Sequence, residues 1–253
     1  MKRALIVDAG NTTLSWRRWE LDEPAGPVMR GRRDKAEEVV AAAVDGRAEA
    51  IVLIASAPEL GVAIEAEAIL ARMRVVRPGK DLPVAMETEY RVAGQLGVDR
   101  LLGAYAAMKL VGAPVVTCSA GTCVTMEAVD KRGVLVGGAI TPGLRAMMAG
   151  VKAAAPHLPV PEELPLAGLG GDVVGKTTEE NLSVGIWLSL GAMLDRLAEL
   201  GRYAVGMGAP VVMTGGDAAA AVRYCRAVTR IVPDLAMDGA ARALEAWVED
   251  EQL

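Results

Sequence analysis

The segment VDAGNTT, residues 7–13, combines an acid with small amide and hydroxyl side chains. An apolar run precedes Asp8 and an alternating run follows Thr13, so the segment is predicted to form the tip of a β-hairpin. Gly10 exposes backbone N–H groups, and the adjacent Asn and Thr side chains add donors suited to phosphate oxygens. Asp8 would repel phosphate directly, but it could hold Mg²⁺ through water, and the metal would bridge to phosphates. Alone, the segment fits a simple turn equally well, since Asp, Gly and Asn are ordinary turn residues.

A second segment repeats this pattern about half the chain later. Residues 5–16 read LIVDAGNTTLSW, and residues 115–127 read VVTCSAGTCVTME. Both consist of an apolar strand, Ala-Gly, a threonine-bearing turn and an alternating strand. Such an internal repeat predicts two duplicated halves with a site between them. We place the boundary near residue 112, which gives the halves 1–112 and 113–253.

Strand and helix patterns alternate along the chain, and this alternation predicts an α/β architecture. Strands are predicted at 3–7, 12–20, 51–55, 114–118, 123–129, 133–137 and 210–214. Helices are predicted at 34–44, 59–72, 99–110, 141–152, 179–201, 217–227 and 239–249. Four helices have a predicted N-cap: Asp34, Asp99, Thr178 and Asp238.

Composition argues against nucleic acid, zinc and membrane as partners. Aromatic residues are 3% of the chain, too few for recognition by base stacking. The RGRR run at 30–33 is followed by acids, which indicates a solvated helix entrance rather than a nucleic-acid patch. Three cysteines without a CxxC pair and one histidine argue against zinc. The first apolar run is too short for a signal peptide, and the longest, 182–194, is too short for a membrane span, so we expect a cytoplasmic protein.

Several short motifs together resemble the acetate and sugar kinase, Hsp70 and actin superfamily and, within it, type III pantothenate kinase. The motifs are DAGNTT at 8–13, Tyr90 followed by LGVDR at 96–100, AGT at 120–122, GGAITPGL at 137–144, KTTEE at 176–180 and TGGD at 214–217. The resemblance covers nearly the whole length. It implies two ribonuclease H-like halves and a homodimer. The implied activity is ATP-dependent phosphorylation of pantothenate to 4'-phosphopantothenate, the first step of coenzyme A biosynthesis.

The resemblance also implies roles for individual residues. Residues facing ATP and Mg²⁺ would be Asp8, Ala9, Gly10, Asn11, Thr12, Thr13 and Thr122, with Asp8 holding the metal through water. Residues lining the pantothenate pocket would be Tyr90, Gly97, Val98, Asp99, Arg100 and Thr178. Asp99 would be the general base, because a carboxylate can orient a primary hydroxyl and take its proton. From the residues alone, Asp99 is better explained as an N-cap, and an aspartate can serve both roles.

Two features of the sequence complicate this interpretation. The family usually carries an aspartate that binds a monovalent cation at the position of Ser119, and often an Asp where this chain has Glu127. The change at Ser119 puts activation by K⁺ or ammonium in question. Residues 170–177 match the GxxxxGK[ST] phosphate-loop pattern, but that loop needs a preceding strand, which the prolines upstream disfavour.

Two other functions therefore stay open at this stage. One is a noncatalytic relative of the same fold that acts as a regulator. The other is a kinase for a different small hydroxylated acid. Asp8 and Asp99 favour an enzyme, whereas Ser119 favours the noncatalytic alternative.

Overall fold

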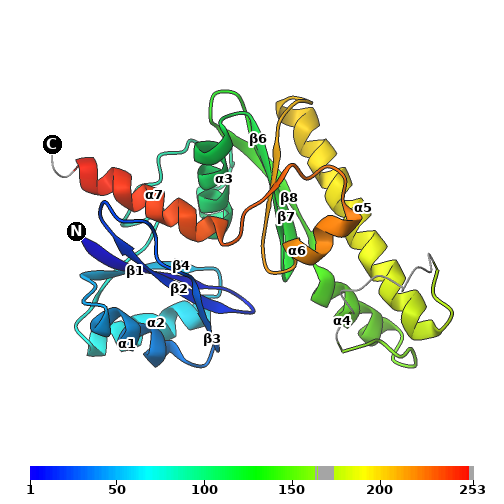
Figure 1. Cartoon of the computed structure of the whole chain (residues 1–253), viewed down its shortest axis with the longest axis horizontal. Coiled ribbons are helices and arrows are strands. Elements are labelled where there is room, and N and C mark those ends of the chain that lie inside the picture. The colour runs from blue at the N-terminus through cyan, green and yellow to red at the C-terminus, as the bar shows by residue number, and fades with distance from the viewer. Residues whose placement is uncertain (163, 165–173, 251–253) are drawn as a thin grey trace. The chain divides into compact units, whose positions relative to one another are not determined.

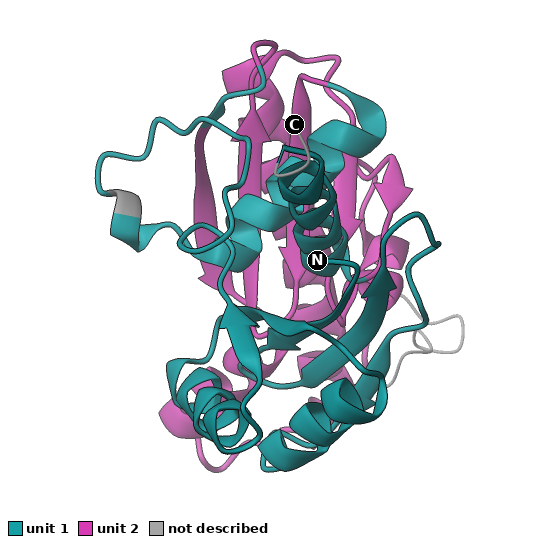
Figure 2. Cartoon of the chain, turned by 90° about the vertical axis from the view of Figure 1, so that its left-hand side faces the viewer, with its two compact units in different colours: residues 1–112, 133–135, 234–253 teal, residues 113–132, 136–233 magenta. Residues whose placement is uncertain are grey.

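The computed structural model describes residues 1–162, 164 and 174–250 of the 253-residue chain (Figure 1). These residues form two compact units (Figure 2). Unit 1 comprises residues 1–112, 133–135 and the segment from Asp234 onward, and unit 2 comprises residues 113–132 and 136–233. The C-terminal segment thus belongs to unit 1, which differs from a division at residue 112 alone.

Unit 1 is built on a five-stranded sheet with the strand order β3-β2-β1-β4-β5. Its strands are β1 (Arg3–Ala9), β2 (Leu14–Glu20), β3 (Met29–Gly31), β4 (Ala50–Ala55) and β5 (Arg74–Val76). Its helices are α1 (Ala36–Asp45), α2 (Pro58–Leu70), the short η1 (Ala93–Gln95), α3 (Val98–Val111) and α7 (Leu235–Asp250). β1 pairs antiparallel with β2 and parallel with β4, so the predicted hairpin is confirmed.

The alternation of β1 explains why unit 1 has a core on each face of its sheet. Successive side chains of a strand point to opposite faces. Ala4 and Ile6 therefore join the core formed with α3 and α7, and Leu5 and Val7 join the core formed with α1 and α2. Asp8 continues the Ala4–Ile6 row. Its carboxylate accordingly belongs to the face that carries α3 and α7.

Unit 2 repeats the plan of unit 1 with the strand order β10-β9-β6-β7-β8. Its strands are β6 (Val115–Ala120), β7 (Cys123–Val129), β8 (Leu135–Pro142), β9 (Val211–Thr214) and β10 (Arg230–Ile231). Its helices are α4 (Leu144–Ala154), α5 (Thr178–Val205), α6 (Ala218–Ala221) and the short η2 (Val222–Tyr224). β6 pairs antiparallel with β7 and parallel with β9, as β1 does with β2 and β4. The two sheets thus share one topology, which supports the predicted duplication.

Most helix starts differ from the sequence predictions by one or two residues, but α4 begins three residues later and α7 four residues earlier than predicted. α1 is capped at Lys35 rather than Asp34, α3 at Gly97 rather than Asp99, and α5 at Thr177 rather than Thr178. Asp238 lies in the first turn of α7 instead of before it.

Other elements were predicted too long or not at all. The helix predicted at 217–227 consists of α6 and η2, which together end at Tyr224. The short strands β3, β5 and β10 were not predicted, because two or three residues carry no usable alternation.

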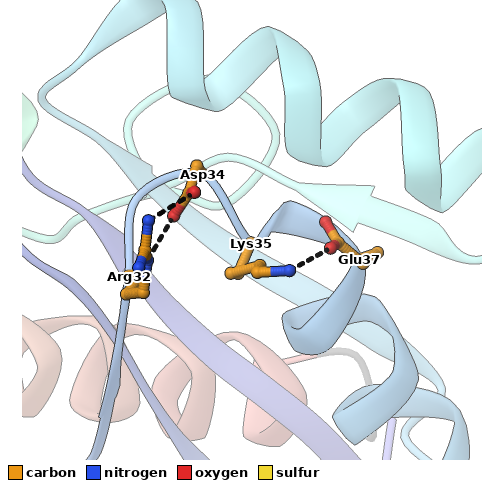
Figure 3. A network of polar contacts seen from close by, with 4 residues as sticks. All are labelled: Arg32, Asp34, Lys35 and Glu37. Carbon is orange, nitrogen blue, oxygen red and sulfur yellow. Dashed lines mark hydrogen bonds and ion pairs between the residues drawn. The ribbon is translucent and has the colours of Figure 1, made fainter.

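The basic run before α1 pairs with its own acids (Figure 3). Arg32 donates two hydrogen bonds of 2.9 Å to the carboxylate of Asp34, and Lys35 Nζ lies 3.4 Å from Glu37 Oε1. All four side chains are exposed. This local neutralisation fits the solvated helix entrance that the sequence predicts.

A helix that crosses a bilayer needs about 20 consecutive, predominantly apolar residues. Within the described ranges, no helix is both long and apolar enough to cross a membrane.

Candidate active site

The first loop is a tight turn between β1 and β2. The Gly10 N–H donates to the Thr13 carbonyl at 3.0 Å, which closes the hairpin. Asn11 Nδ2 donates to the Ser56 carbonyl at 3.4 Å, and the Ala57 N–H donates to the Ala9 carbonyl at 2.9 Å. The tip is therefore held against the end of β4, the parallel neighbour of β1. Loops at the carboxyl ends of adjacent parallel strands are a common place for ligands to bind.

Asp8 lies at the end of β1 in a strongly acidic environment. Burial, and to a lesser extent the nearby carboxylates of Asp99 and Asp234, together raise the pKa of its carboxyl group from 3.8 to about 7. A buried carboxylate beside other carboxylates is stabilised by a cation. The fold thus brings Asp8 close to Asp99, two residues that lie far apart in the sequence.

Asp99 lies in the first turn of α3, just after the residue that caps the helix. Gly97 is that N-cap, with extended backbone angles (φ −58°, ψ 133°), and its carbonyl accepts the N–H groups of Arg100 and Leu101 at 3.1 Å each. A Cβ at position 97 would lie only 2.6 Å from Asp99 Oδ1. Gly97 therefore leaves room for the Asp99 carboxylate, and Asp99 does not have the N-cap role that the residues alone suggest.

Tyr90 and Arg100 are in direct contact. Arg100 Nη2 donates to the Tyr90 hydroxyl at 2.8 Å, and the guanidinium carbon lies 5.7 Å from the centre of the Tyr90 ring. Both side chains are partly buried. Two residues predicted to line the pantothenate pocket are thus in contact with each other, and a planar guanidinium is a group that suits a carboxylate.

The second loop, between β6 and β7, is packed tightly by two glycine-bearing segments of unit 2. The Gly143 N–H donates to the Thr122 carbonyl at 3.1 Å, and a Cβ at position 143 would lie 2.7 Å from that oxygen. Gly215 has a φ of +101°, and a Cβ there would overlap the Ala120 carbonyl. The GGAITPGL and TGGD segments thus meet the AGT loop through backbone contacts that other residues would prevent.

Ser119 occupies the strand position that matches Asp8. It pairs with Thr125 on β7 and Thr214 on β9, and the adjacent pair Thr117–Glu127 shares its face of the sheet. Glu127 is 2% exposed, and its Oε2 accepts hydrogen bonds from Thr117 Oγ1 at 3.3 Å and Thr125 Oγ1 at 3.2 Å. Sequence alternation could not determine the face of Glu127, and the register now places it with Ser119.

Thr178 is the first residue of α5. Thr177 caps this helix, because its hydroxyl accepts the Glu180 N–H at 3.2 Å and the Glu180 carboxylate accepts the Thr177 N–H at 3.1 Å. The cap leaves the exposed Thr178 hydroxyl outside this reciprocal pair. The phosphate-loop match begins at Gly170, and residues 170–173 of that match lie outside the described residues. Its Thr177 hydroxyl serves the helix cap.

The donors present suit Mg²⁺ bound mainly through water and phosphate. Within the described part of the chain, no three His, Cys, Asp or Glu residues are grouped so as to hold a metal by themselves. Mg²⁺ in phosphate-transfer sites uses one or two carboxylates together with water and substrate oxygens. Asp8, at the end of β1 beside the first loop, is a carboxylate of the type that such sites use.

Two residues near the first loop carry no sequence signal. Asp234 precedes α7 with a φ of +53° and contributes to the raised pKa of Asp8. Ser56 follows β4, and its Oγ is buried with no hydrogen-bond partner. Neither belongs to a motif, so only the fold reveals their positions.

The repeated sheet topology and paired loops define the acetate and sugar kinase, Hsp70 and actin class. Two solved structures share this fold. A protein from Campylobacter jejuni described as a Baf family transcriptional activator has a TM-score of 0.60 at 18% identity, over 98% of this chain and 100% of that one. The activator of 2-hydroxyisocaproyl-CoA dehydratase from Clostridium difficile, with bound ADPNP, has a TM-score of 0.53 at 16% identity, over 99% of this chain and 97% of that one.

Sequence comparison identifies the family. The profile of type III pantothenate kinase matches residues 4–200, and the chain belongs to this family. It is 31% identical to the type III pantothenate kinase of Rubrobacter xylanophilus over 201 residues, 76% of this chain and 74% of that protein. It is 32% identical to that of Rhizorhabdus wittichii over 145 residues, 57% of this chain and 55% of that protein. The chain is thus a kinase of the family that phosphorylates pantothenate in coenzyme A biosynthesis, and the predicted fold class and enzyme class are confirmed.

Proposed function

We propose that the chain transfers the γ-phosphate of ATP directly to the primary hydroxyl of pantothenate, with Asp99 as the general base and Asp8 at the phosphate end. The observation that best supports this is the electrostatic proximity of Asp8 and Asp99. Phosphoryl transfer needs a group that orients the acceptor hydroxyl and a separate group that holds the metal beside the phosphates. Two carboxylates from different elements provide these two functions.

On the acceptor side, Asp99 accepts the hydroxyl proton of pantothenate as the oxygen attacks phosphorus. Arg100, held against Tyr90, pairs with the substrate carboxylate through its planar fork. Gly97 and Val98 shape the same part of the pocket, and Gly97 keeps space for the Asp99 carboxylate. From unit 2, we assign Thr178 to pantothenate binding.

On the phosphate side, the side chains of Asn11, Thr12 and Thr13 donate hydrogen bonds to phosphate oxygens. From unit 2, Thr122 does the same. Ala9 and Gly10 bind ATP by letting the phosphates approach the hairpin tip closely, because the Gly10 N–H is already bonded to the Thr13 carbonyl. Asp8 would hold Mg²⁺ through water, and the metal would supply charge neutralisation at the phosphates.

The remaining assignments concern the ion, the assembly and the compartment. We propose a cytoplasmic homodimer with no nucleic-acid or membrane partner. We also propose that a monovalent cation, K⁺ or ammonium, binds only weakly at Ser119. A neutral hydroxyl attracts a cation far less than a carboxylate does.

A coupled assay of ADP release tests the proposed activity. The purified protein with MgATP should release ADP only when pantothenate is present, and mass spectrometry should detect 4'-phosphopantothenate. A panel of other small hydroxylated acids provides the control for acceptor specificity. Release with another acid but not with pantothenate would overturn the substrate assignment. Nucleotide binding without any release would indicate a noncatalytic relative.

A further inference from the structure

A row of side chains crosses three strands at the phosphate end of unit 1. Asp8 on β1 pairs with Ser15 on β2, and Ser15 pairs with Arg30 on β3. Residues directly opposite in neighbouring strands point to the same face of a sheet. Strands are about 4.8 Å apart, so the Arg30 backbone lies about 10 Å from that of Asp8. Arg30 therefore projects on the same face as Asp8, from the edge of the sheet.

The guanidinium of Arg30 pairs with Asp234, which also interacts electrostatically with Asp8. Arg30 Nη2 lies 2.7 Å from Oδ1 and 2.8 Å from Oδ2 of Asp234, just before α7. Asp234 is one of the two carboxylates that raise the pKa of Asp8. The Arg30 guanidinium is thus bound to a carboxylate that is a neighbour of Asp8.

Arg17, another arginine on this face, serves a different purpose. It lies on β2 opposite Ile6, is 7% exposed, and forms an ion pair of 2.8 Å with Asp238. Asp238 lies one helical turn after Asp234, so the two arginines fasten the start of α7 to the sheet. A buried, paired arginine would pay a large desolvation cost to change partners, whereas the Arg30 side chain is 55% exposed.

We propose that Arg30 is an additional phosphate-binding residue, held in place by Asp234. This inference rests on the proposed placement of the ATP phosphates beside Asp8. Asp99 and Asp234 both lie close enough to Asp8 to act on it electrostatically, and triphosphate adds further negative charge. A guanidinium at the edge of this group neutralises phosphate charge and presents several donors to its oxygens.

Arg32 provides a matched control for Arg30. It belongs to the same basic run, also pairs with an aspartate, and is exposed (Figure 3). It lies beyond the last residue of β3 and outside the Asp8–Ser15–Arg30 row. Arg30→Gln should raise the KM for MgATP about 10- to 100-fold, the usual effect of losing a hydrogen bond to a charged group. Arg32→Gln should leave it within about twofold, as expected for a surface pair.

Two further substitutions test the positive charge of Arg30 and the role of Asp234 in holding Arg30 in place. Arg30→Lys should recover part of the affinity for MgATP, because lysine keeps the charge without the fork. Asp234→Asn should weaken nucleotide binding less than Arg30→Gln, and the double variant should be no worse than Arg30→Gln alone. Independent, additive losses in the double variant would overturn the anchoring role of Asp234.

The KM for pantothenate, the melting temperature and the use of MgATP by Asp8→Asn separate this proposal from a structural effect and from the proposed function itself. The KM for pantothenate and the melting temperature of Arg30→Gln should match wild type. A melting temperature lowered together with both KM values would make Arg30 structural and overturn its phosphate role. If Asp8→Asn impairs MgATP use and Arg30→Gln behaves like Arg32→Gln, only the Arg30 assignment is wrong. If neither variant affects MgATP use, the placement of the phosphates is wrong as well.

Discussion

The two hairpin loops share a scaffold and differ in charge. In the first, Asp8 ends its strand among the carboxylates of Asp99 and Asp234. In the second, the matching position is Ser119, and the nearby carboxylate of Glu127 is buried behind threonine hydroxyls. The second loop is distinguished instead by close backbone packing at Gly143 and Gly215. The first loop is thus distinguished by neighbouring acidic groups, and the second by backbone contacts.

Replacing the proposed base should have the largest effect. Asp99→Asn should lower turnover by about two to four orders of magnitude, the usual contribution of general-base catalysis. Asp99 follows the cap of α3, so losing its charge at the helix N-terminus should cost at most about 1 kcal/mol of stability. Steady-state rates measure the change in turnover, and a melting curve measures the change in stability. Near-normal turnover would remove Asp99 from the mechanism.

The next effect concerns the acid of the first loop. Asp8→Asn should weaken Mg²⁺-dependent use of ATP by about 10- to 100-fold, the range seen when a group that orients a metal is lost. Pantothenate binding should change little, because Asp8 belongs to the phosphate end. Calorimetry with each substrate separates the two. An equal loss of both affinities would mean that the substitution damaged the fold.

The same substitution should stabilise the metal-free protein in a pH-dependent way. The pKa of Asp8 is raised from 3.8 to about 7, so between these values the folded state holds a proton that the unfolded state releases. The destabilisation of the folded wild type by Asp8 therefore grows from pH 4 to pH 7 and is constant above pH 7. The stability of Asp8→Asn should exceed that of wild type by about 4 kcal/mol at pH 8 and match it near pH 4. Urea unfolding at both pH values measures this. A stability difference that does not depend on pH would contradict the raised pKa.

The smallest effect should come from the second loop. Wild-type activity should change by less than about twofold when K⁺ replaces Na⁺ at constant ionic strength, which removes differences due to screening. Ser119→Asp should strengthen the dependence on K⁺, because it adds a charge beside the buried Glu127. Initial rates in KCl and NaCl series provide the measurement. A wild-type rate that collapses in Na⁺ and recovers in K⁺ would show that a cation site exists without the acid.

The sequence predicted the parts of this structure that depend on local patterns. Alternation of apolar residues located both hairpins, and the glycine-containing turns marked both loops. Three helix caps were missed by one or two residues, because residues such as Gly97 and Thr177 compete with equally plausible neighbours and tertiary contacts decide between them. The start of α7 was missed by four residues.

Contacts between residues distant in sequence could not be predicted in this way. The Arg30–Asp234 salt bridge joins residues 204 positions apart, and no local pattern connects them. The raised pKa of Asp8 has the same origin, since it depends on burial and on acids from α3 and the start of α7. The residue types of the site were thus visible in the sequence, whereas their electrostatic coupling required the fold.

The return of α7 to unit 1 has a consequence for how this protein is made. Leu244 and Val248 of α7 belong to the same core as Ala4 and Ile6 of β1, and Gly239 meets the backbone of α3 at Leu102. A ribosome translates all of unit 2 before it reaches this helix. Until then, the nascent first unit exposes the apolar face that α7 later covers. The core of unit 1 therefore stays incomplete until α7 has been synthesised. During that interval, its exposed apolar face is accessible to chaperones and proteases and is prone to aggregation.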